Sequence, residues 1–142
     1  MASVVMTKFK YESGIAGINL SADPLKVALI DNIFTTSAVS AIANTSDWGD
    51  VSATWEITGT GYTAGGAALT GCNVIENDSL TKMVFSATDV TWSSSTVNAY
   101  GATIYRISDR LPVCAIDFGG VKSSVVGNFT IQWNSNGVLN LS

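Results

Sequence analysis

Apolar and polar residues alternate along much of the C-terminal two-thirds of the chain. Phe129, Ile131 and Trp133 are separated by single polar residues, and residues 96–107 show the same alternation. Successive side chains of a β-strand point to opposite faces, so a period of two predicts half-buried strands. The pattern therefore favours β-structure over helix in this part of the chain.

Other apolar runs predict further strands, at Phe9–Ile18, Leu25–Ile30, the segment around Met83 and Phe85, Val113–Phe118 and Val138–Leu141. We expect Gly119-Gly120 to end the run before it, and Asn134-Ser135-Asn136-Gly137 to form a turn. Short strands separated by turns at roughly 8–12-residue spacing are typical of a sandwich or barrel. We therefore predict an all-β, single-domain antiparallel β-sandwich over residues 25–142, preceded by a strand or arm over residues 1–24.

Helical periodicity is weak everywhere, and at most one or two short helices are expected. Val39, Ile42 and Ala43 have helical spacing within Thr35–Ala43. A second short helix is predicted over Asp50–Ile57 with Asp50 as its N-cap, a position that aspartate favours.

The composition narrows the possible partners. Charged residues make up 13% of the 142 residues and the net charge is −4. The seven basic residues are scattered rather than clustered, so direct nucleic-acid binding is not expected. No apolar run approaches the ~20 residues that span a bilayer, and residues 1–6 do not resemble a signal peptide, so we expect no membrane partner and synthesis in a cytoplasm.

The inventory of reactive residues predicts neither an enzyme nor a cofactor or metal site. The chain has no histidine, which removes the commonest general base and metal ligand. Cys72 and Cys114 are isolated; they are either buried strand residues or partners in a disulfide. The aspartates, including Asp47 and Asp50, suit turns and caps, although a glycosidase pair of carboxylates distant in sequence stays open.

The glycine-rich stretch Gly59–Gly66 invites comparison with a nucleotide-binding loop. Gly59, Gly61 and Ala64 fit the spacing of a dinucleotide fingerprint, but Gly65-Gly66 occupies the place where a helix should open. Each glycine there would cost a helix about 1 kcal/mol relative to alanine. We therefore interpret the stretch as an ordered surface loop whose backbone needs positive φ angles or close approach.

Aromatic residues are the candidate contacts to a partner. Trp48 and Tyr62 lie in loops rich in Gly and Asp and are expected to be exposed, whereas the aromatic residues within apolar patterns are expected in the core, namely Trp55, Trp92, Phe129 and Trp133. Phe9 and Tyr11 belong to the predicted N-terminal strand or arm, which is suited to reaching a neighbour. The predicted partner contacts are thus Phe9, Tyr11, Trp48 and Tyr62.

Several of these segments together resemble a family of small structural proteins encoded beside the major capsid protein of tailed bacteriophages. The resemblance covers residues 25 to 141, and its most specific pieces are Gly61-Tyr62-Thr63-Ala64-Gly65-Gly66 and Asp89-Val90-Thr91-Trp92. The other matching segments are Leu25–Ile30, Glu56–Thr60, Leu69-Thr70, Ala102–Tyr105, Ile116–Gly120 and Phe129–Trp133.

The resemblance implies a virion protein, and for some similar proteins a jelly-roll β-sandwich that cements the head. It implies binding to the major capsid protein on the capsid surface, after synthesis in the host cytoplasm. Capsid symmetry favours a homodimer or homotrimer. A tail or baseplate component and a carbohydrate-binding adhesin module are the alternatives.

Overall fold

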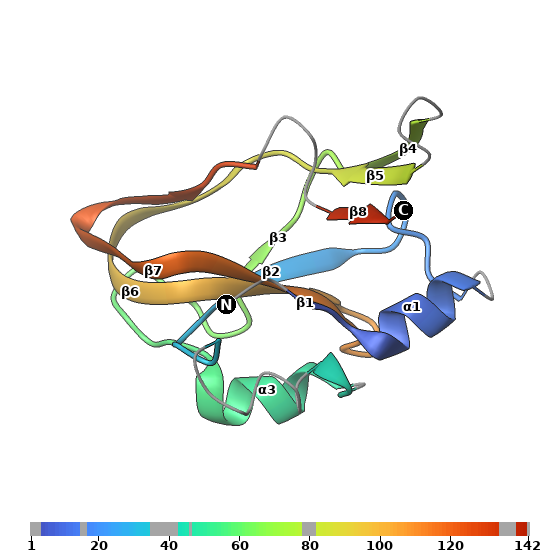
Figure 1. Ribbon diagram of the computed structural model, residues 1–142. Coiled ribbons are helices and arrows are strands. Elements are labelled where there is room, and N and C mark those ends of the chain that lie inside the picture. Colours follow the sequence, from blue (N-terminus) through green and yellow to red (C-terminus); the bar gives the residue numbers. More distant parts are fainter. Residues whose placement is uncertain are drawn as a thin grey trace.

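The computed structural model describes residues 4–14, 17–34, 43–45, 47–77, 82–133 and 139–141. The described part is mostly strand, in two antiparallel sheets with two short helices, which confirms the all-β prediction. In Figure 1 the helices lie below the larger sheet and the smaller sheet lies above it. The jelly-roll form of the sandwich stays a prediction.

The larger sheet has five strands in the order β1-β7-β6-β2-β3. Their bounds are β1 Val4–Val5, β2 Leu25–Ile30, β3 Ala67–Ala68, β6 Val90–Arg106 and β7 Pro112–Ile131. The smaller sheet has the order β4-β5-β8, with β4 Asn73–Asn77, β5 Lys82–Ser86 and β8 Leu139–Leu141. The strand predicted at residues 25–30 is confirmed, whereas the turn predicted at residues 134–137 lies outside the described residues.

The strand predicted over Phe9–Ile18 is wrong, because this region forms helix α1, Thr7–Gly14. Phe9 is only 1% exposed, whereas Tyr11 is 58% exposed. Two residues apart in a strand would share one face, but in a helix they point in nearly opposite directions. The N-terminal segment expected as a strand or arm thus contains the two-residue strand β1, paired with β7, and a helix.

The second helix, α3, spans Trp48–Trp55 rather than Asp50–Ile57. Its N-cap is Asp47, whose carboxylate accepts a hydrogen bond from the Gly49 amide at 2.7 Å. Asp50, the predicted cap, lies in the first turn of the helix, where a negative charge also suits the helix dipole. Most of the other predicted helix, residues 35–42, lies outside the described residues.

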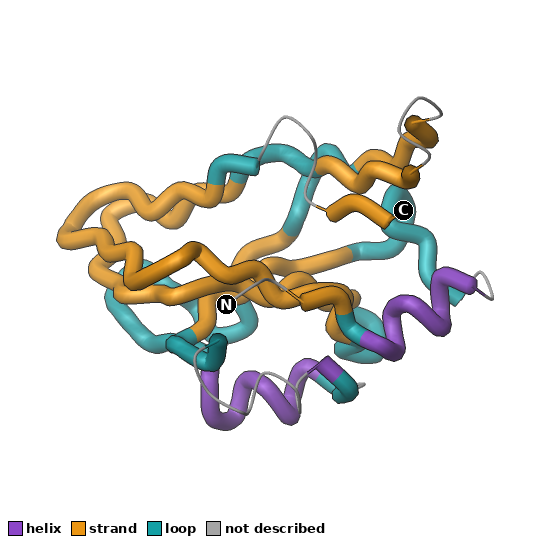
Figure 2. Tube along the Cα trace, viewed as in Figure 1, coloured by secondary structure: helices purple, strands orange, loops and turns teal. Residues whose placement is uncertain are grey.

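The hairpin of β6 and β7 dominates the fold (Figure 2). The sequence predicted several short strands here, but β6 has 17 residues and β7 has 20. Gly119-Gly120 does not end a strand, because both glycines lie within β7 where its register with β6 shifts. Such bulges bend a strand without ending its pairing. The hairpin therefore folds back on itself at one end of the molecule (Figure 1).

The core draws residues from almost every element. Phe9 of α1, Val51 of α3 and the apolar side chains of β2 are fully buried, as are those of Ala102 and Ile104 in β6. Trp92 and Phe129 are buried, and Trp55 and Trp133 are partly buried against the core cluster, so all four aromatic residues predicted for the core belong to it.

Candidate functional site

The Gly59–Gly66 loop is held against the rest of the chain by hydrogen bonds to Leu29 and Glu56. The Tyr62 hydroxyl donates to Oε2 of Glu56 at 2.6 Å and accepts from the Leu29 amide at 3.0 Å. Its ring lies against Trp92, with 5.9 Å between the ring centroids. Burial raises the pKa of the Tyr62 phenol, and the hydrogen bond to Glu56 raises it further. Tyr62 thus packs inward, contrary to its expected exposure.

Packing explains the glycines of this loop. Gly66 has φ +85°, and a Cβ placed there would run into the Val27 carbonyl and lie 2.7 Å from the Cα of Ala28. The Glu56 carboxylate fixes the loop from its other side by accepting the Gly65 amide at 2.6 Å. Gly66 is therefore required by its close approach to β2, and Gly59 and Gly61 by theirs to β6, which supports the prediction of an ordered loop with positive φ angles or close approach.

Of the four predicted partner contacts, the structure exposes one. Trp48 is 4% exposed and stacks on Tyr105, with ring centroids 5.0 Å apart. Trp48 begins α3 and faces the sheet, so its expected exposure was wrong, and Phe9 is likewise buried in α1. Tyr11 is exposed on α1. Its contact with a partner stays a prediction.

The exposed apolar side chains gather instead on the far half of β7. Val121 is 49% exposed, and Val125 and Val126 are 79% and 78% exposed. These three are half of the six large apolar side chains exposed in the described part of the chain. Exposed apolar side chains are normal when scattered singly, whereas several within six residues of one strand make that strand a candidate interaction surface. Sequence reasoning missed this surface because it took Gly119-Gly120 for the end of a strand.

The bend beneath these valines is held by a buried hydroxyl cluster. Ser95 is fully buried, and its hydroxyl oxygen lies 2.8 Å from the Ser124 hydroxyl oxygen. Its single proton is shared between the carbonyl oxygens of Trp92 and Gly127, which lie at 3.1 Å and 3.0 Å. The Ser124 hydroxyl returns a bond of 2.9 Å to the Ser95 carbonyl. A buried and satisfied network of this kind fixes one geometry. Specific hydrogen bonds between β6 and β7 thus stabilise the bend of the hairpin.

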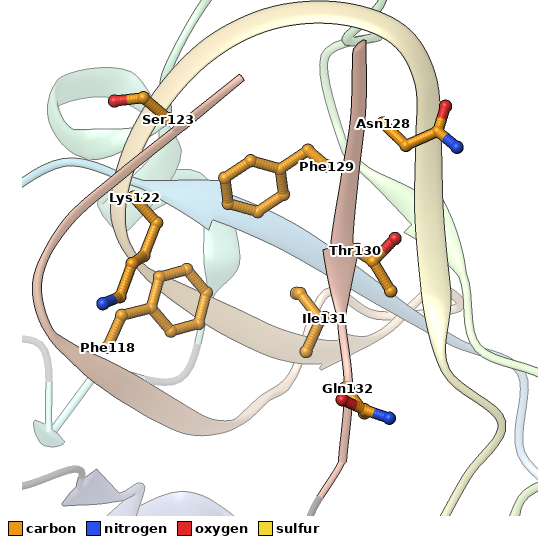
Figure 3. A pocket seen from close by; sticks show the side chains of 8 residues that line it. All are labelled: Phe118, Lys122, Ser123, Asn128, Phe129, Thr130, Ile131 and Gln132. Carbon is orange, nitrogen blue, oxygen red and sulfur yellow. The ribbon is translucent and has the colours of Figure 1, made fainter.

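A pocket of about 520 Å³ lies on the inner side of the bend (Figure 3). Phe118 and Phe129 form its apolar part, with ring centroids 6.3 Å apart. The remaining lining residues are Lys122, Ser123, Asn128, Thr130, Ile131 and Gln132. All eight belong to β7 or directly follow it, so one folded strand makes the whole pocket.

Both cysteines are free thiols, which decides between the two alternatives left by the sequence. Cys114 lies buried in β7, and burial raises its pKa to about 12. Cys72 lies just before β4 and is partly buried, which also raises its pKa. Both therefore behave as small apolar residues rather than nucleophiles.

Arg106 forms ion pairs with two aspartates. The Arg106 guanidinium bonds to carboxylate oxygens of Asp23 at 2.9 Å and Asp109 at 2.8 Å. Arg106 lowers the pKa of Asp109, and the Asn19 amide together with Arg106 lowers that of Asp23. These contacts connect the segment before β2 with the end of β6, so we assign them a structural role.

Within the described ranges, no three His, Cys, Asp or Glu side chains come together as a metal site would require. No helix in the described part is long and apolar enough to cross a membrane. No family model, curated protein or solved structure matches the chain. The exposed residues of β7 and the sequence resemblance are therefore the features that bear on function.

Proposed function

We propose that this chain is a non-enzymatic bacteriophage virion protein that decorates the assembled head and stabilises it. The observation that carries the proposal is the group of exposed valines on β7, which supports a role in binding another protein. The resemblance to small proteins encoded beside the major capsid protein supplies the partner class. The partner is the major capsid protein, and the location is the capsid surface after synthesis in the host cytoplasm.

Physical features of the surface support an assembly role. A cement protein binds at many equivalent joints, where weak contacts add through multivalency. It needs rigid strands and exposed edges more than it needs charge. A chain with 13% charged residues and a long bent hairpin fits that requirement.

The copy number of the chain in purified virions tests this proposal. A decoration protein should be present in many copies at a fixed ratio to the shell protein on a quantitative gel. Shells lacking it should lose their contents at a lower temperature than complete shells. Adding the purified chain should raise that temperature to the original value. Absence from virions, or a few copies confined to the tail, would contradict head decoration; the second result would indicate the tail or baseplate alternative.

The pocket supports one further candidate, a carbohydrate-binding adhesin module. Sugars stack on aromatic rings and bond to amides and hydroxyls, and the pocket offers Phe118 and Phe129 beside Asn128, Thr130 and Gln132. Binding on a glycan array that is lost in Phe118→Ala, but kept in the exposed α3 variant Thr54→Ala, would favour the adhesin. Silence on the array would leave head decoration as the better explanation.

A further inference from the structure

The outer edge of β7 is a long open edge of the described hairpin. On one side of the hairpin, β2 pairs with residues 101–106 of β6, and Thr60 forms a single bridge to Thr96. On the other side, β1 pairs only with Cys114 and Ala115 of β7. An open edge presents unpaired backbone groups and is a template for another strand.

Residues 121–125 form a regular stretch of this edge between two irregularities. Gly119 and Gly120 precede it with φ angles of +80° and +148°, and Val126 follows it with φ +45°. Within the stretch Ser124 is buried and the other four residues are exposed. Strand alternation places Val121, Ser123 and Val125 on one face, and Lys122 and Ser124 on the other.

The stretch is complementary to itself. When two copies pair antiparallel with Ser123 opposite Ser123, the whole regular stretch pairs. Val121 of each copy then lies opposite Val125 of the other, which makes two cross-strand valine pairs. Lys122, the only charged residue of residues 121–125, lies opposite Ser124 and not opposite its own copy, so like charges are not apposed.

We propose that β7 pairs with β7 of a second copy of this chain about a two-fold axis at Ser123. The contact is isologous, because both copies contribute the same edge of β7. It therefore forms a closed dimer. It brings the exposed Val121 and Val125 of the two copies together and continues the sheet from one copy into the next. A short edge contact of this kind is weak in solution and gains strength where neighbouring copies are held on a lattice.

Cysteine cross-linking tests both the contact and its register. In a Cys72→Ala background, Ser123→Cys places two thiols at the axis, where paired strands bring Cα atoms within the 4.4–6.8 Å that a disulfide spans. With oxidised glutathione as oxidant, we expect a disulfide dimer whose yield rises with protein concentration. Thr54→Cys, exposed on α3, is the control for random collision and should cross-link at least about tenfold more slowly.

Two further variants make the test specific. A mixture of Val121→Cys and Val125→Cys chains should cross-link faster than either chain alone, because the pairing puts these positions opposite each other. Val125→Lys in the Ser123→Cys chain should slow dimer formation about tenfold at an unchanged denaturation midpoint. Ser123→Cys cross-linking no faster than Thr54→Cys, or Val121→Cys chains cross-linking best with themselves, would overturn the proposal.

The test is independent of the capsid proposal, because it uses the purified chain without shells. A chain that dimerises through Ser123 but is absent from virions would contradict head decoration alone. A chain abundant on virions that fails to cross-link would contradict the β7 contact alone.

Discussion

Replacing Gly66 with alanine should be among the most destabilising single changes in this chain. A non-glycine residue near φ +85° costs about 1–2 kcal/mol. The added Cβ also collides with the Val27 carbonyl and lies 2.6 Å from its carbon. Val27 and Ala28 are fully buried in β2, which pairs with β6, so the obstructing backbone has little freedom to move.

Overpacking of a tight site typically costs about 1–3 kcal/mol. The two contributions together give about 2–5 kcal/mol, against a total stability of about 5–15 kcal/mol for a domain. Urea denaturation of Gly66→Ala measures this loss as a lower midpoint at an unchanged slope. Expression of a soluble chain with a far-ultraviolet spectrum like that of the parent would show that the comparison is between folded proteins.

Gly119→Ala is the matched control. Gly119 has a similar φ of +80°, but no atom lies within 4 Å of a Cβ built there. It therefore incurs the conformational cost of about 1–2 kcal/mol without the collision. Equal midpoints for Gly66→Ala and Gly119→Ala would refute the reasoning, because the close approach to β2 would then contribute nothing.

Three further outcomes are expected. Tyr62→Phe should lower the free energy of unfolding by about 1–3 kcal/mol because it breaks two partly buried hydrogen bonds, whereas Tyr100→Phe should change it by less than about 0.5 kcal/mol; chemical denaturation compares them. The aspartates paired with Arg106 have a folded pKa below the ordinary 3.8, so their contribution is present above that pH and is lost as pH falls through the folded values. In Arg106→Gln the urea midpoint should therefore decrease less as the pH is lowered. A pH dependence equal to that of the parent would contradict the pairing. Thiol titration should find Cys114 unreactive and Cys72 slow in the folded chain at pH near 8, and two thiols after unfolding without reductant; fewer than two would reveal a disulfide.

The sequence predicted those elements whose local pattern matches their environment. Leu25–Ile30 is a continuous apolar run, and the structure makes it a strand with the same bounds. The segment around Phe9 also alternates polar and apolar residues, since Lys8 and Lys10 flank Phe9 and Tyr11 follows. Over so few residues a helix with one buried side chain produces the same pattern, so periodicity alone could not decide.

The candidate site was harder to predict because it depends on irregular backbone. Aromatic residues in glycine-rich loops were expected at the surface, but Tyr62 and Trp48 have partners distant in sequence that draw them inward. The exposed valines lie on β7, where Gly119-Gly120 bends a strand that they were expected to end. A bulge and a strand end use the same residues, and only the register with β6 distinguishes them.

The positive φ of Val126 connects the strain of the hairpin with its exposed surface. Consecutive residues of a regular strand face opposite sides, yet Val125 and Val126 are both more than three-quarters exposed. The left-handed turn of the backbone at Val126, costly for a β-branched residue, rotates the chain so that neither side chain enters the core. The same turn ends the regular stretch at Val125 and so defines which residues can pair with a second copy. The Val126 amide donates to Oγ1 of Thr96 at 3.0 Å, so a contact within the chain holds this strained residue in place while its side chain stays exposed.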